Sequence, residues 1–153
     1  MEHLLFLTQR IPYPPDKGDK IRSWRILQYL AQRYHVHLGC FYDDPADAQH
    51  IPFLKTVCAS VFCQPLQPLL ARLRSLTALA RGEALTLGYF ADARLRDWVD
   101  ATLGTRAPSR VFVFCSAMAP YVQGYACELS VLDMVDVDSD KWRQYAATKP
   151  WPF

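Results

Sequence analysis

The sequence predicts an α/β protein with one doubly wound, mostly parallel sheet. Short apolar runs alternate with amphipathic helical stretches along the 153 residues, which is the order of elements typical of such folds. A strand, a loop, a helix and a second strand follow one another within residues 1–42, and this spacing indicates a parallel pair. Hydrophobic residues make up 51% of the chain, enough to fill a single core.

The first β-α-β unit is the clearest part of the pattern. Leu4–Leu7 is a short continuous apolar run, as expected of a strand that is buried on both faces. The loop Gln9–Asp19 carries three prolines and one glycine and has no hydrophobic period. His35–Tyr42 predicts the second strand. Between loop and strand, one apolar stripe recurs every three or four residues and predicts a helix: Ile21, Trp24, Leu27, Leu30, Ala31 and Tyr34.

The alternation continues more weakly to the end of the chain. Gly104 lies just past the helix predicted over Ala91–Leu103, where it would serve as a C-terminal cap. The leucine-rich segment Pro68–Ala80 also carries arginines, so it indicates either a helix packed on the sheet or one lying on an anionic membrane. In order, the expected elements are helix Ala46–Val57, strand Ser60–Gln64, helix Pro68–Ala80, helix Ala91–Leu103, strand Arg110–Cys115, helix Met118–Ala126, strand Ser130–Met134 and a helix from about Asp138.

Charge and cysteine content exclude several classes of function. The net charge of +2 gives no electrostatic case for binding nucleic acid. No apolar run is long enough to cross a bilayer, and the N-terminus lacks the basic region and cleavage site of a signal peptide. The five cysteines form no CxxC pair and show no metal-ligand spacing to the four histidines. We therefore expect a reduced cytoplasmic protein without a structural metal.

The loop after the first strand is the first candidate site. It contains neither GxGxxG nor a P-loop motif, yet Gly18 beside a helix start would let backbone N–H groups approach a phosphate. Asp19 fits a helix N-cap, and Lys20 and Arg22 add positive charge at that end. The alternative is a proline-stiffened turn with a routine cap.

Two further loops follow the fourth and fifth predicted strands. Asp136 and Asp138 belong to an acidic segment that either binds a divalent metal, like the DxD motif of single-domain glycosyltransferases, or caps the next helix. The second reading is favoured, with Asp136 facing the cleft. Ser116 would bind a sugar hydroxyl or start a helix, and no GxSxG elbow marks it as a nucleophile.

Two segments carry a resemblance to a known family. Residues 7–23 (LTQRIPYPPDKGDKIRS) and residues 133–146 (DMVDVDSDKWRQYA) resemble bacterial sugar transferases associated with exosortase exopolysaccharide systems, which belong to glycosyltransferase family 4. The likeness extends over residues 1–153. It implies a retaining enzyme of GT-B architecture, in which two Rossmann-like domains face each other across a cleft.

By this resemblance, the chain is the N-terminal, acceptor-side domain, and its C-terminal donor-binding domain is absent. The family's Glu-x7-Glu element has no counterpart here. Gly18 maps to the family's phosphate-contacting loop, with Asp19, Lys20 and Arg22 beside it, whereas Cys115-Ser116 stands where many members have a histidine. No catalytic residue, cofactor or bound metal is therefore assigned.

The function expected from the resemblance is transfer of a sugar in exopolysaccharide biosynthesis, with the fragment itself inactive. A nucleotide-sugar would be the co-substrate and a glycan or lipid-linked oligosaccharide the acceptor, with peripheral contact at the inner face of the plasma membrane. The alternatives are a non-enzymatic α/β binding or regulatory module, and a metal-dependent DxD transferase centred on Asp136 and Asp138.

Overall fold

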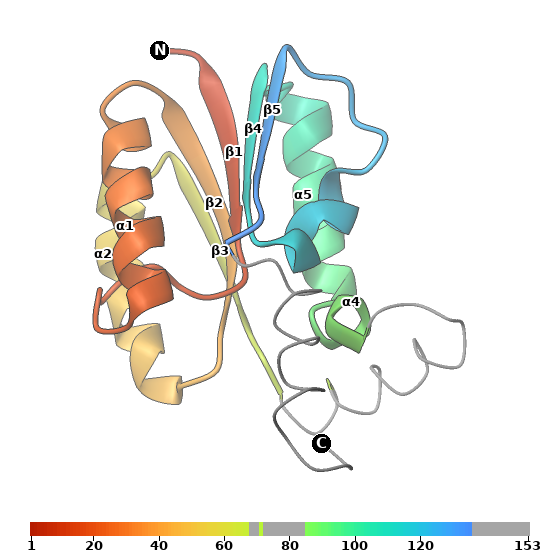
Figure 1. Ribbon diagram of the computed structural model, residues 1–153. Coiled ribbons are helices and arrows are strands. Elements are labelled where there is room, and N and C mark those ends of the chain that lie inside the picture. Colours follow the sequence, from red (N-terminus) through yellow and green to blue (C-terminus); the bar gives the residue numbers. More distant parts are fainter. Residues whose placement is uncertain (68–70, 72–84, 136–153) are drawn as a thin grey trace.

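The computed structural model describes residues 1–67, Ala71 and residues 85–135 (Figure 1). Within these residues, one five-stranded sheet has the order β3-β2-β1-β4-β5, and every neighbouring pair is parallel. The predicted doubly wound α/β class is confirmed, and the sheet is Rossmann-like. The strands are β1 (His3–Thr8), β2 (His35–Tyr42), β3 (Ser60–Pro65), β4 (Arg110–Phe114) and β5 (Leu129–Asp133).

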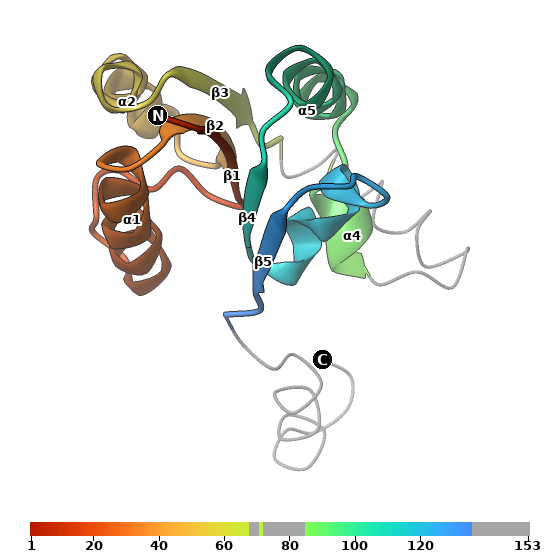
Figure 2. The ribbon, with the colours of Figure 1, turned by 90° about the horizontal axis from the view of Figure 1, so that it is seen from above.

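Helices cover both faces of the sheet (Figures 1 and 2). One face carries α1 (Gly18–Ala31) and α2 (Ile51–Val57), and the opposite face carries α4 (Leu85–Tyr89), α5 (Ala93–Arg106) and the 3₁₀ helix η2 (Ser116–Val122). The chain thus changes faces between β3 and β4. In a doubly wound sheet this change makes β1 and β4 the point from which successive connections leave in opposite directions.

The central strand β1 divides the core into two layers. Leu4 and Phe6 pack on the face of α1, while Leu5 and Leu7 pack on the face of α5. All four side chains are at most 3% exposed. This two-sided burial explains why β1 is a continuous apolar run instead of an alternating one.

Close packing of α5 on the sheet requires glycine at position 39 of β2. A Cβ placed there would lie 2.8 Å from Leu7 Cδ2 and 2.9 Å from Trp98 Cζ3. Both distances are shorter than real Cβ contacts allow. Gly39 therefore lets α5 approach the middle of the sheet.

The buried face of α1 differs from the predicted stripe. Ile21 was expected to face the core, but its side chain is 41% exposed, whereas that of Lys20 is 1% exposed. The helix begins at Gly18 with an extended Lys17 as N-cap, so the prediction that Asp19 caps the helix is wrong. Asp19 instead lies in the first turn, where a carboxylate still interacts favourably with the helix dipole.

Other helix boundaries also depart from the predicted ones. α5 continues past Gly104 to Arg106, and its C-cap Ala107 takes the left-handed conformation with φ of 42°. The helix expected over Ala46–Val57 starts as the 3₁₀ helix η1 (Pro45–His50), and α4 was not predicted. The predicted helices Pro68–Ala80 (apart from Ala71, which is helical) and that from Asp138 lie outside the described residues.

The cysteines remain as thiols within the fold. None of the five cysteines forms a disulfide, and Cys40 Sγ lies 3.2 Å from Cys63 Sγ on the neighbouring strand. Burial raises the pKa of Cys58 to about 12, so this thiol stays protonated.

Among the described residues, no helix has the length and apolar character that crossing a bilayer requires.

Candidate functional site

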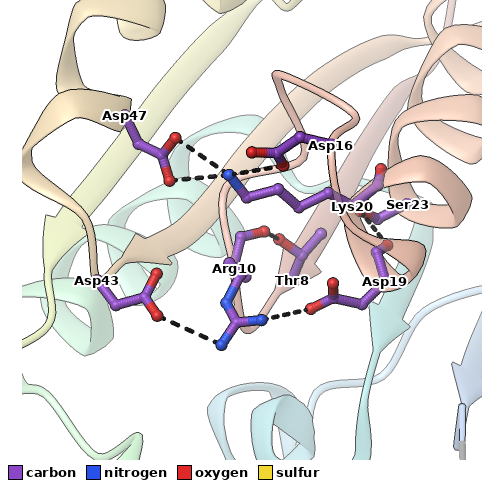
Figure 3. Close-up of polar contacts among 8 residues, drawn as sticks. All are labelled: Thr8, Arg10, Asp16, Asp19, Lys20, Ser23, Asp43 and Asp47. Carbon is purple, nitrogen blue, oxygen red and sulfur yellow. Dashed lines mark hydrogen bonds and ion pairs between the residues drawn. The ribbon is translucent and has the colours of Figure 1, made fainter.

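The candidate site lies at the carboxyl ends of β1 and β2, where a cluster of charged side chains gathers (Figure 3). The loop after β1 is held in place at two points. Thr8 Oγ1 donates a hydrogen bond to the carbonyl of Arg10, and the N–H of the buried Ile11 donates to the carbonyl of Phe41 on β2 at 2.6 Å. Because both anchors are formed by the backbone at Arg10 and Ile11, the sheet defines the path of the loop at Arg10.

Arg10 joins the two loops of this edge. Its guanidinium donates to Asp19 at 2.9 Å and to Asp43 at 3.3 Å, and all three side chains are between 23% and 37% exposed. Asp19 belongs to the first turn of α1, and Asp43 directly follows β2. This Arg10 clamp is therefore open to solvent while each of its members has an ion-pair partner.

Lys20 lies beneath the clamp and is buried. Its ammonium is 3.0 and 2.9 Å from the two carboxylate oxygens of Asp47, on η1, and 3.4 Å from Asp16. The side chains of Lys20 and Asp47 are 1% and 9% exposed, whereas that of Asp16 is 52% exposed. A buried ammonium needs such partners because desolvating it alone would be very costly. The ion pair between Lys20 and Asp47 thus holds η1 against α1.

Arg22 points along the same carboxyl end of the sheet toward the edge strand β5. It pairs with Asp133, the last residue of β5, at 2.7 Å, and its guanidinium lies over the ring of Phe114 at 5.9 Å from the centroid. The Arg22 side chain is 54% exposed, so it remains accessible to a ligand. This pair ties the start of α1 to the edge strand.

Gly18 is exposed at the start of α1. A Cβ at this position would have no atom within 4 Å, and Gly124 is the one described glycine with a positive φ. Neither space nor backbone conformation therefore requires glycine here in the protein alone. A requirement for glycine at position 18 would have to come from a bound ligand.

Ser116 lies away from the Arg10 clamp. It follows Cys115, whose φ of 85° turns the chain from β4 into η2. Its side chain lines a cavity together with Val113, Ser130 and Leu132. Of the predicted site residues, the structure thus brings Asp19 and Lys20 together with Gly18, places Arg22 against Asp133, and separates Ser116. Asp136 and Asp138 lie outside the described residues.

Negative charge predominates in the charged cluster. Burial alone would raise the pKa of Asp16, but the charge of Lys20 and a backbone hydrogen bond outweigh it and hold that pKa below its ordinary value. Asp16 is therefore ionised at neutral pH. Four carboxylates, Asp16, Asp19, Asp43 and Asp47, lie around Arg10 and Lys20, and Lys17 is a third cation close enough to act on Asp16, so the carboxylates exceed the cations by one. An excess of carboxylates attracts cations and accepts hydrogen bonds from hydroxyl groups, and it repels phosphate.

Sequence reasoning did not single out Arg10, Asp43 and Asp47. Their positions in the sequence could have identified Arg10 and Asp43. Arg10 comes two residues after β1 and Asp43 directly after β2, and ligands bind at the carboxyl ends of strands in such sheets. The described residues contain no group of three or more acidic, histidine or cysteine side chains suited to holding a metal ion. Comparisons with protein-family models, curated proteins and solved structures found no match for this chain.

Proposed function

We propose that this chain is the acceptor-side domain of a sugar transferase, and that the Arg10 clamp binds hydroxyl groups of the acceptor. The proposal rests on the resemblance of residues 7–23 and 133–146 to family 4 glycosyltransferases, together with one observation. That observation is the excess of carboxylates at the carboxyl ends of β1 and β2. The Rossmann-like sheet fits a GT-B domain, although many unrelated functions use such sheets.

The chemistry of the clamp suits a neutral polyol. Asp19 and Asp43 are partly exposed acceptors, and Arg10 is a partly exposed donor held between them. Donors and acceptors that alternate along one edge can bind adjacent hydroxyl groups of a sugar ring. We assign Lys20 a positioning role, because its burial keeps it from reaching a ligand and its pairing fixes Asp47 and η1.

The donor's diphosphate fits this side of the cleft poorly. A doubly charged group near Asp19 and Asp43 would meet repulsion that Arg10, already paired to both, offsets only in part. Among the described residues at the start of α1, Lys17, Arg22 and the backbone at Gly18 remain to face a phosphate. The main diphosphate contacts would then come from a second, donor-binding domain.

Ligand titration of the protein tests this assignment. Calorimetry and saturation-transfer NMR would compare a panel of neutral disaccharides with UDP-glucose and GDP-mannose. We expect weak, saturable binding of at least one disaccharide and no comparable binding of the nucleotide-sugars. Micromolar binding of a nucleotide-sugar without any disaccharide binding would contradict the acceptor-side assignment, and would favour a donor or metal-dependent site.

A further inference from the structure

A separate cavity lies on the face of the sheet that carries η2 and α4. Its volume is about 430 Å³, and its walls come from α4, β4, η2 and β5. Pockets that bind small molecules in proteins have volumes of roughly 300–1,000 Å³. No residue of the Arg10 clamp lines it, so it is a different site from the charged cluster.

The walls of this cavity are mainly apolar. Leu87, Val113, Pro120, Val122 and Leu132 contribute to them, and none of the described residues that line the cavity is charged. An ionised group that entered would lose hydration without meeting an opposite charge. The part of a ligand that fits here is therefore neutral and largely hydrocarbon.

Three hydrogen-bonding side chains also face this cavity. They are the hydroxyls of Ser116 and Ser130 and the amide of Gln123. In the part of the chain that the structure describes, none of the three has a hydrogen-bond partner, so each is available to a ligand. Neutral donors and acceptors of this kind recognise a hydroxyl or an ether oxygen. Because Val113 pairs with Leu132, Ser130 lies before this apolar pair along the strands and Ser116 lies beyond the end of β4. The polar groups therefore flank the apolar wall of the cavity.

Apolar surface continues beyond the cavity along β5. Leu132 lines the cavity and is still 45% exposed, and Met134, two residues further on, is 53% exposed. Large apolar side chains exposed together at the edge of a binding pocket commonly mark a contact surface. A ligand with a hydrocarbon chain that extends out of the cavity would cover both.

We propose that this cavity binds a neutral amphiphile, with its aliphatic chain against Val113 and Leu132 and its hydroxyl-bearing end at one of the two flanking serines, Ser116 or Ser130. Binding would remove apolar surface of the cavity from water and satisfy the free hydroxyls. The proposal depends on the cavity alone and holds whether or not the chain belongs to a sugar transferase.

Three probes test the ligand chemistry by calorimetry, below the micelle concentration of each detergent. They are n-octyl β-D-glucoside, sodium octyl sulfate and glucose. We expect saturable 1:1 binding of octyl glucoside, at least about tenfold weaker binding of octyl sulfate, and none of glucose at the same concentration. Absence of saturable octyl glucoside binding, or a preference for the sulfate, would overturn the proposal.

Two matched variants of β5 locate the binding site. Leu132 and Leu129 are 45% and 48% exposed, but only Leu132 lines the cavity. Leu132→Trp should fill the cavity and weaken octyl glucoside binding about tenfold or more, while Leu129→Trp should change it less than about twofold. Circular dichroism would check that both variants keep the fold. Equal weakening by the two variants would show non-specific detergent binding and refute the site.

Discussion

The two ends of the sheet hold their polar groups in different ways. At the carboxyl ends of β1 and β2, ionised side chains pair with one another, and several of them reach solvent. At the amino ends, His37 Nδ1 lies 2.7 Å from Ser60 Oγ, and its Nε2 lies 2.8 Å from His3 Nδ1. Burial, together with the nearby charges of His3, Arg106 and His35, lowers the pKa of His37 to about 4, so the His37 imidazole is neutral at pH 7.

This difference separates stability from recognition. His37 is 3% exposed and Lys20 is 1% exposed, so both polar contacts hold elements together out of reach of a ligand. The Arg10 clamp makes similar contacts, yet its members are partly exposed. Exposed ion pairs contribute little to folding, so their arrangement is free to serve binding. The carboxyl end therefore combines a buried support with an accessible layer above it.

The largest expected effect on stability is at the buried ion pair of Lys20 and Asp47. Asp47→Ala would leave the Lys20 ammonium buried with only the exposed Asp16 as partner, which should lower the free energy of unfolding by about 3 kcal/mol. Asp16→Ala is the matched control, because it removes the exposed partner of the same ammonium and should cost less than about 1 kcal/mol. Urea denaturation measures both. Equal costs would mean that burial does not distinguish the two pairs.

The stability of the protein should depend on pH through His37, at the amino ends of the strands. His37 has a folded pKa of about 4, below the value of about 6.5 in an unfolded chain, so the unfolded state binds more protons between these two values. The free energy of unfolding should therefore fall as the pH is lowered from about 6.5 to about 4, by on the order of 2 kcal/mol. Well below pH 4, where His37 is protonated in both states, this group should contribute no further change.

Urea denaturation at several pH values would compare the wild type with His37→Gln. The variant keeps a hydrogen-bonding side chain beside Ser60 but has no imidazole to protonate, so its stability should vary less over this range. The same pH dependence in both proteins would assign the effect to other groups.

Features that depend on neighbouring residues in the sequence were predicted, and contacts between distant residues were not. The strand His35–Tyr42 has the predicted bounds, because its apolar run reflects local burial. Burial of Lys20 was missed, since the apolar period placed Ile21 on the inner face and the partner Asp47 is 27 positions away. Likewise, Arg10 and Asp43 are separated by 33 positions. Pairs of this kind become visible only when the topology brings two strand ends together.

A smaller effect on stability is expected at the clamp. Arg10→Ala removes two partly exposed ion pairs, which should cost less than about 1 kcal/mol of unfolding free energy. Thermal and urea denaturation would measure it. A cost near that of Asp47→Ala would show that the clamp is structural, and would remove the distinction between the two layers.

The smallest effect is expected at the start of α1. Gly18→Val adds a side chain into open space at a position without a positive φ, so the unfolding free energy should change by less than about 0.5 kcal/mol. A melting curve beside the wild type checks this. If a nucleotide-sugar approaches this backbone in a two-domain enzyme, the loss should appear in turnover instead, while a loss of stability would contradict the open environment of Gly18.

Sugar binding by two neighbouring aspartate variants tests the central claim most directly. Asp43→Asn removes the carboxylate that Arg10 holds, whereas Asp44→Asn changes an adjacent residue whose side chain caps η1, a role that asparagine also fills. Calorimetry with the disaccharide that binds the wild type should show at least about tenfold weaker binding for Asp43→Asn and less than about twofold change for Asp44→Asn, with both melting temperatures nearly unchanged. Undiminished binding by Asp43→Asn would contradict the account.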